Sequence, residues 1–222
     1  MRLLYHFCLD PFSRKVRIVL GEKRLAFELR EERPWERRDA LVALNPAGEV
    51  PVLVEPDGAA VADSAAICEF LDEVYPEPPL LGADPAARAE VRRLAAWFDG
   101  KFHREVTANL LDEKILRRLA GSGGPDSRAI RAGHAGLRDH LDYVAWLSDE
   151  RGWLAGARFS LADAAAAAQL STLDYLGDVP WEAHPGAKDW YARAKSRPSL
   201  RPLLADHLAG APPPAHYANL DF

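Results

Sequence analysis

The chain has 222 residues, of which 48% are hydrophobic and 27% charged, ordinary values for a globular protein of one or two domains. Its net charge of −5 argues against a general nucleic-acid binder, and no apolar run approaches the roughly 20 residues needed to cross a bilayer. The start of the chain lacks the features of a signal peptide. Two cysteines, Cys8 and Cys68, are too few for a disulfide scaffold or a zinc cluster, and each is expected to be a small buried residue. We therefore expect a cytoplasmic protein without a metal site, without nucleic acid and without membrane insertion.

Residues 1–76 alternate between strand and helix patterns. Pro11 suits the first turn of a helix that is capped by Asp10 and runs to about Lys23. The other predicted elements are strands at 3–7, 26–30, 52–55 and 59–61, a polar loop at 31–38 followed by a short helix, and a helix at 64–74. This order predicts a small α/β layer with a mixed four-stranded sheet.

The segment 45–53, Asn-Pro-Ala-Gly-Glu-Val-Pro-Val-Leu, is typical of a loop that runs into a strand. Pro51 cannot donate to a ladder, so we expect a cis Val50–Pro51 bond that makes a sharp corner. The corner would leave the Val50 backbone free to pair with an extended peptide. Asp63 and Ser64 open the next helix, and its N-terminus would attract a carboxylate. These features predict a pocket for a small acidic peptide; a plain strand–helix turn is the alternative.

After a linker at 77–84, residues 85–210 are predicted to be all-helical. A long helix from 86 towards Leu116 ends before the glycine-rich segment 121–125, and further helices are expected at 127–149, 185–197 and 199–208. Ser160 and Asp163 form a capping box ahead of five alanines. This small-residue helix is expected at the buried centre of the helical domain. A proline-rich tail occupies 211–222.

Four of these elements, in this order, resemble the cytosolic glutathione transferase family over nearly the whole chain. They are the first-helix segment 10–17, the loop 45–53, the helix start at 63–67 and the capping box at 160–163. The resemblance implies the glutathione transferase fold, with a thioredoxin-like domain at 1–76 and an all-α domain at 85–210. It also implies a homodimer, with glutathione as substrate or ligand and no other cofactor. Val50 and Pro51 would hold the glutathione backbone, and Asp63 and Ser64 its γ-glutamyl end.

One position departs from the family's pattern. In the serine- and cysteine-type branches the residue before Pro11 is the catalytic Ser or Cys, whereas here it is Asp10. An ionised carboxylate donates no hydrogen bond and repels a thiolate, although it is a good helix cap. Ser13 and Tyr5 are substitute catalytic candidates, and a structural role is expected for each. The resemblance therefore implies weak or absent transferase activity, with no catalytic residue assigned.

The tail and one tryptophan indicate a protein partner. Prolines 212–214 stiffen the tail, and it ends in the anchors Tyr217, Leu220, Asp221 and Phe222. Trp35 lies in a loop of charges, where it either anchors an interface or covers the edge of its own domain. The alternative for the tail is that it folds back on the helical domain.

The tail and the segment 9–14 resemble a branch of alphaproteobacterial glutathione-transferase-like division proteins that bind filaments of the tubulin homologue FtsZ. The resemblance implies a protein that contacts FtsZ through groove and loop residues plus the tail. An active glutathione transferase that conjugates glutathione to small electrophiles is the alternative function. A glutathione-binding protein without chemistry is a third.

Overall fold

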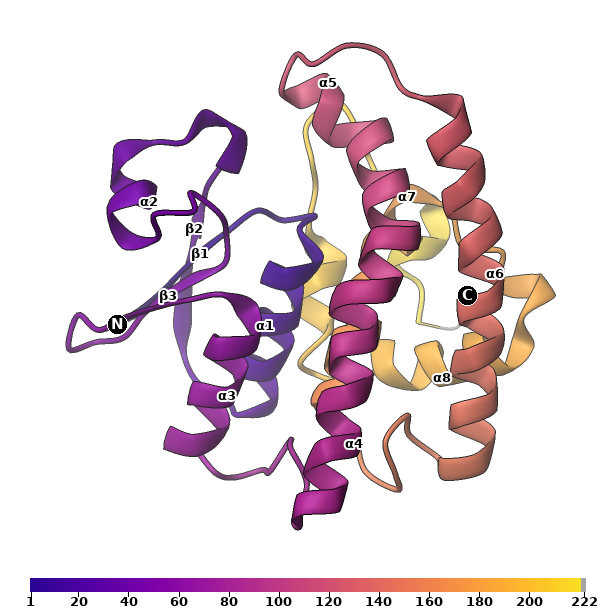
Figure 1. Cartoon of the computed structure of the whole chain (residues 1–222), viewed down its shortest axis with the longest axis horizontal. Helices are drawn as coiled ribbons and strands as arrows, with labels where there is room; N and C mark the ends of the chain where they lie inside the picture. The colour runs from indigo at the N-terminus through magenta and orange to yellow at the C-terminus, as the bar shows by residue number, and fades with distance from the viewer. Residues whose placement is uncertain (221–222) are drawn as a thin grey trace.

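The computed structural model describes residues 1–220, which form an α/β part followed by a helical part (Figure 1). The strands are β1 (Arg2–His6), β2 (Phe27–Glu31), β3 (Val52–Val54) and β4 (Ala60–Ala62). They form one sheet in the order β2–β1–β3–β4. Leu4 of β1 lies opposite Leu29 in a parallel pair and opposite Leu53 in an antiparallel pair. The mixed four-stranded sheet predicted from the sequence is confirmed.

Three helices accompany the sheet. They are α1 (Pro11–Glu22), α2 (Asp39–Leu44) and α3 (Ser64–Val74), with a 3₁₀ turn, η1 (Pro34–Glu36), before α2. Figure 1 shows α1 and α3 between the sheet and the helical part, and α2 on the opposite side of the sheet. Because α1 has neighbours on both sides, even its basic residues Arg14, Lys15 and Arg17 are buried. Each of them is paired with a carboxylate on the helical part.

The helical part begins with a long rod. The helical part as a whole contains the helices α4 (Pro85–Ala96), η2 (Trp97–Leu116), α5 (Arg117–Leu119), α6 (Ser127–Arg151), α7 (Leu161–Leu176) and α8 (Pro185–Lys195). It also contains the short 3₁₀ turns η3 (Trp181–Ala183), η4 (Arg201–Ala205) and η5 (Ala215–Ala218). Figure 1 shows α4, η2 and α5 as one continuous rod, in which η2 has the wider winding of a π-helix. Between residues 85 and 220 the chain forms only isolated bridges and no strand, as the sequence predicts.

Helix α7 lies at the centre of the helical part. Every residue from Leu161 to Tyr175 is buried. Its run of alanines lets α1, α4 and η2 pack against it, because an alanine side chain keeps helix axes close. The capping box at Ser160 and Asp163 is present. The Asp163 carboxylate also accepts hydrogen bonds from the Leu154 N–H at 2.9 Å and the Trp190 indole N–H at 3.1 Å.

One predicted helix is wrong. The sequence pattern predicts a helix at 199–208, but only the 3₁₀ turn η4 forms there. Asp206 ends the turn with an extended backbone, and its carboxylate accepts hydrogen bonds from the Arg17 guanidinium at 2.8 and 2.9 Å. The long-range ion pair therefore overrides the local helical preference.

The segment 77–84 is packed against the helical part. Leu80 and Leu81 are buried, and the Leu80 carbonyl accepts the Leu161 N–H at 2.9 Å. The start of the core helix is thus tied directly to the segment that connects the two parts.

Replacing Asp163 with alanine should strongly destabilise the protein. The change leaves the Leu154 N–H, the Ser160 N–H and the Trp190 indole N–H buried without an acceptor, and we expect a loss of about 3 kcal/mol or more in the free energy of unfolding. Urea denaturation of both proteins measures this loss in the free energy of unfolding. Asp163→Asn keeps one acceptor oxygen and should lose less. Equal stability of Asp163→Ala and wild type would contradict this role.

Candidate functional site

A cleft of about 470 Å³ lies between the two parts of the molecule. One wall comes from the β1–α1 turn, η1 and the loop before β3, and the other from η2 and α5. Its lining is mainly apolar and includes Phe7, Phe12, Trp35, Val50, Leu111 and Leu116. Its polar lining residues include Asp10, Glu49, His103, Asp112 and Arg117. The cleft therefore has an aromatic interior and several titratable groups on its walls.

Asp10 caps α1 at the edge of this cleft, as predicted. Its carboxylate accepts the Ser13 backbone N–H at 2.6 Å. Burial raises the pKa of Asp10 from 3.8 to about 6, and the hydrogen bonds that it accepts from Ser13 oppose the rise. The group is still mostly ionised at pH 7, so it offers little hydrogen-bond donation to a ligand sulfur.

The two substitute catalytic candidates do not reach the cleft. Ser13 is fully buried one turn into α1, and it lines neither this cleft nor the hollow beside it. Tyr5 lies within β1 opposite Val52, and the Arg30 guanidinium is 5.5 Å from the centre of its ring. Ser13 is enclosed by the packing around α1 and Tyr5 belongs to the sheet, so neither side chain lines the cleft.

A second hollow of about 630 Å³ adjoins the cleft and shares Phe12, Glu49 and Val50 with it. All four residues of the predicted glutathione site, Val50, Pro51, Asp63 and Ser64, line this hollow. The Val50–Pro51 bond is cis, as predicted. Asp63 caps α3 by accepting the N–H groups of Ala65 and Ala66 at 2.8 and 3.0 Å. The structure thus brings the sequence-predicted loop and helix start together.

Trp35 lies half-buried in η1 and lines the cleft. Its ring meets Phe7 edge to face, with ring centroids 5.3 Å apart and planes at 84°. Trp35 is therefore neither isolated on the surface nor enclosed in the core. It covers Phe7 of its own domain and contributes to the cleft wall.

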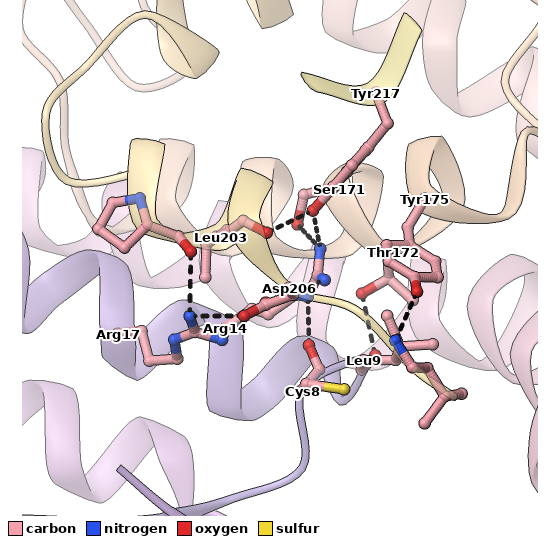
Figure 2. Close-up of polar contacts among 12 residues, drawn as sticks. Cys8, Leu9, Arg14, Arg17, Ser171, Thr172, Tyr175, Leu203, Asp206 and Tyr217 are labelled. Atoms are coloured by element: carbon pink, nitrogen blue, oxygen red, sulfur yellow. Dashed lines mark hydrogen bonds and ion pairs between the residues drawn. The ribbon is translucent and has the colours of Figure 1, made fainter. Parts of the chain in front are cut away.

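The tail folds back on its own helical domain as far as Tyr217. Figure 2 shows the Tyr217 side chain pointing towards Arg14, and its hydroxyl accepts a hydrogen bond from that guanidinium at 3.0 Å and donates one to the Leu203 carbonyl at 2.8 Å. Tyr217 is 0% exposed. The expectation that it anchors a partner is therefore corrected. Leu220 is half-buried, and Asp221 and Phe222 lie outside the described residues.

Both cysteines are buried, as predicted. Burial raises the pKa of Cys8 to about 11 and that of Cys68 to about 12. Within residues 1–220, no three His, Cys, Asp or Glu side chains are placed to hold a metal ion. No helix in the same range has both the length and the apolar character of a membrane span.

Sequence reasoning missed the cleft residues on the helical part. His103, Asp112 and Arg117 all reach the cleft from the continuous rod. The His103 ring lies 4.7 Å from Phe12, and burial lowers its pKa. The available signal was weak: these three residues are among many charged and polar side chains of the rod, and nothing local shows which of its faces meets the first domain.

The chain belongs to the glutathione S-transferase family. Residues 11–74 match the model of the glutathione S-transferase N-terminal domain, and residues 141–198 match that of the C-terminal domain. The chain is 53% identical over 224 residues to FtsZ-localized protein A of Caulobacter vibrioides, with 100% of this chain and 98% of that protein covered.

Two solved structures are similar over the full chain. A glutathione S-transferase from Rhodospirillum rubrum F11 has a TM-score of 0.98 at 58% identity, with 100% of both chains covered. FzlA from C. crescentus has a TM-score of 0.97 at 53% identity, with 100% of this chain and 99% of that chain covered. The predicted glutathione transferase fold is confirmed.

Replacing Asp10 with asparagine tests the raised pKa of this carboxyl group. Asparagine keeps an acceptor for the Ser13 N–H and removes the charge. Because the pKa is about 6 when folded and near 3.8 when unfolded, ionisation costs more in the folded state, and stability falls as pH rises between these values. Asp10→Asn should therefore gain on the order of 2 kcal/mol at pH 7.

Chemical denaturation of both proteins from pH 7 to pH 4 measures this gain, which should shrink as wild-type Asp10 becomes protonated. Asp10→Ala is the control for the cap, and it should be less stable than Asp10→Asn by about 1 kcal/mol at every pH. A difference between wild type and Asp10→Asn that does not change with pH would contradict the assignment.

Proposed function

We propose that this chain is a glutathione-transferase-like protein that binds FtsZ filaments in bacterial cell division, with weak or no transferase activity. The observation that carries the proposal is its full-length similarity, at 53% identity, to a protein named FtsZ-localized protein A. Asp10 supports the loss of thiol chemistry, since a largely ionised carboxylate occupies the position where the family's serine and cysteine branches keep a donor.

The binding surface that we propose is the cleft together with the end of the tail. Trp35 supports this choice because it lines the cleft and keeps part of its surface free for a partner. Since Tyr217 is enclosed, the tail contribution falls to Leu220, Asp221 and Phe222.

We also propose a cytoplasmic homodimer, which the family resemblance implies. The exposed aromatic surface on α6 supports a contact between copies: Trp146 is 54% exposed and stacks on Tyr143, with ring centroids 6.0 Å apart. Tyr143 in turn packs against Trp97 at the start of η2, with ring centroids 4.9 Å apart. A dimer would carry two clefts and could engage two filament subunits at once.

Trp35→Ala should weaken filament binding at least tenfold, because it removes the largest aromatic side chain of the cleft wall. Co-sedimentation with polymerised FtsZ measures the affinity. Leu29→Ala, on the outer strand β2, is the control and should pellet like wild type. Thermal unfolding of each variant separates binding from stability. Equal pelleting of folded Trp35→Ala and wild type would contradict the role of the cleft.

A second candidate function is glutathione conjugation. The cis Val50–Pro51 corner and the Asp63 cap meet in one hollow, and this geometry favours binding of the tripeptide. The same corner and cap also serve the fold, so the hollow supports binding more than it supports chemistry.

Asp10→Ser should increase thiol activation if glutathione binds, because it replaces a repelling carboxylate with a hydroxyl donor at the N-terminus of α1. Conjugation of a chlorodinitrobenzene-type electrophile measures turnover. We expect wild-type turnover close to background and a rise of tenfold or more in the variant. Brisk wild-type turnover would favour the transferase, and no gain in the variant would show that Asp10 is not what suppresses the chemistry.

A further inference from the structure

Two exposed carboxylates, those of Glu49 and Asp112, line the cleft. Glu49 lies in the loop before β3, and Asp112 lies on η2, so they come from the two opposite walls. In residues 1–220 neither carboxylate group takes part in an ion pair or a hydrogen bond, although the backbone carbonyl of Glu49 accepts one from the Asn45 side chain at 2.9 Å. The neighbouring Glu113, in contrast, pairs with Arg117 and accepts the Asp126 N–H. Glu49 and Asp112 are therefore free to receive a positively charged group.

The balance of charge along both hollows is negative. Carboxylates on their walls are Asp10, Glu49, Asp63, Asp99 and Asp112, and among the described lining residues Arg117 is the one lysine or arginine. Of these carboxylates, Asp99 is neutralised by Lys15. Burial raises the pKa of Asp112, and repulsion by Glu113 adds to the rise. Low-dielectric walls of one sign concentrate ligands of the opposite charge.

Aromatic rings stand beside these carboxylates. Trp35, Phe7 and Phe12 line the same cleft as Glu49 and Asp112. A guanidinium or ammonium group is attracted to aromatic faces, most strongly to tryptophan. An arginine can also stack its planar group on a ring while it donates two hydrogen bonds to a carboxylate. An aromatic wall flanked by these two carboxylates is thus suited to a positively charged side chain.

We propose that the cleft receives a basic segment of the partner, with an arginine or lysine side chain inserted beside Trp35 and paired with Glu49 and Asp112. The proposal rests on the proposed filament binding and names the chemistry of the segment that docks. Glutathione carries two carboxylates and one ammonium group at neutral pH, so it matches this charge pattern less well than a basic peptide does.

The double variant Glu49→Gln/Asp112→Asn tests the pairing, because it removes both charges and keeps the side-chain shapes. Asp149→Asn/Glu150→Gln, on the exposed end of α6, is the matched control with the same change in net charge. Co-sedimentation with FtsZ filaments over a range of salt concentrations measures affinity. We expect the cleft variant to bind at least tenfold more weakly and with a smaller salt dependence than wild type, and the control to bind like wild type.

A second measurement does not need the filament. A blocked tetra-arginine peptide should shift the NMR signal of the Trp35 indole N–H, assigned with Trp35→Phe, and a tetra-glutamate peptide should not. The cleft variant should show a smaller shift than wild type.

The outcomes separate the two proposals. If wild type pellets with filaments, but the cleft variant pellets equally well and tetra-arginine leaves the Trp35 signal unmoved, the basic segment is excluded while filament binding stands. If wild type does not pellet, filament binding is excluded. The peptide titration then decides by itself whether the cleft takes a cationic group.

Discussion

A buried guanidinium joins the two parts of this molecule. Arg14 of α1 is fully buried and donates to the Cys8 carbonyl at 2.7 Å and to Ser171 of the core helix at 3.0 Å. It also donates to the Tyr217 hydroxyl and pairs with Asp206 at 3.2 Å (Figure 2). A charge removed from water in this way is tolerated only when its donors find partners. The first helix, the core helix and the C-terminal segment are therefore held in one arrangement.

The geometry of the cleft depends on this joint. Its walls belong to different parts of the chain, so their spacing is set by the contacts beneath them. Lys15 with Asp99 adds a second cross-connection, and Arg197 with Glu22 at 2.7 Å adds a third. These pairs are partly or fully buried and bring opposite charges together across the domain boundary. The walls of the cleft are therefore held in place before any ligand enters it.

The features that could be predicted from the sequence are those fixed by neighbouring residues. The cap at Asp10, the corner at Pro51 and the capping box at Ser160 and Asp163 depend on residue types a few positions apart, and all three are present. A run of alanines likewise marks a tightly packed helix. The fold, and the meeting of the loop before β3 with the start of α3 in one hollow, followed from these local signals.

The features that could not be predicted depend on residues far apart in the chain. The burial of Tyr217 cannot be predicted from the tail alone, because its hydroxyl accepts from the Arg14 guanidinium and donates to the Leu203 carbonyl, both far away in the sequence. The helix expected at 199–208 fails because Asp206 is drawn to Arg17. The polar residues of η2 reach the cleft only because the rod packs across the first domain, which periodicity does not reveal.

The continuous rod of α4, η2 and α5 also determines how substitutions can change the cleft during evolution. His103, Asp112 and Arg117 lie on an unbroken run from α4 to α5, which packs against α6 and α7. A substitution at a buried position of the rod, at Phe98 for example, would change how the rod packs and could thereby move the wall that carries these side chains. Substitutions at buried residues of the rod, which contact no ligand, can therefore alter what the cleft binds. A comparison of surface residues alone would overlook such changes.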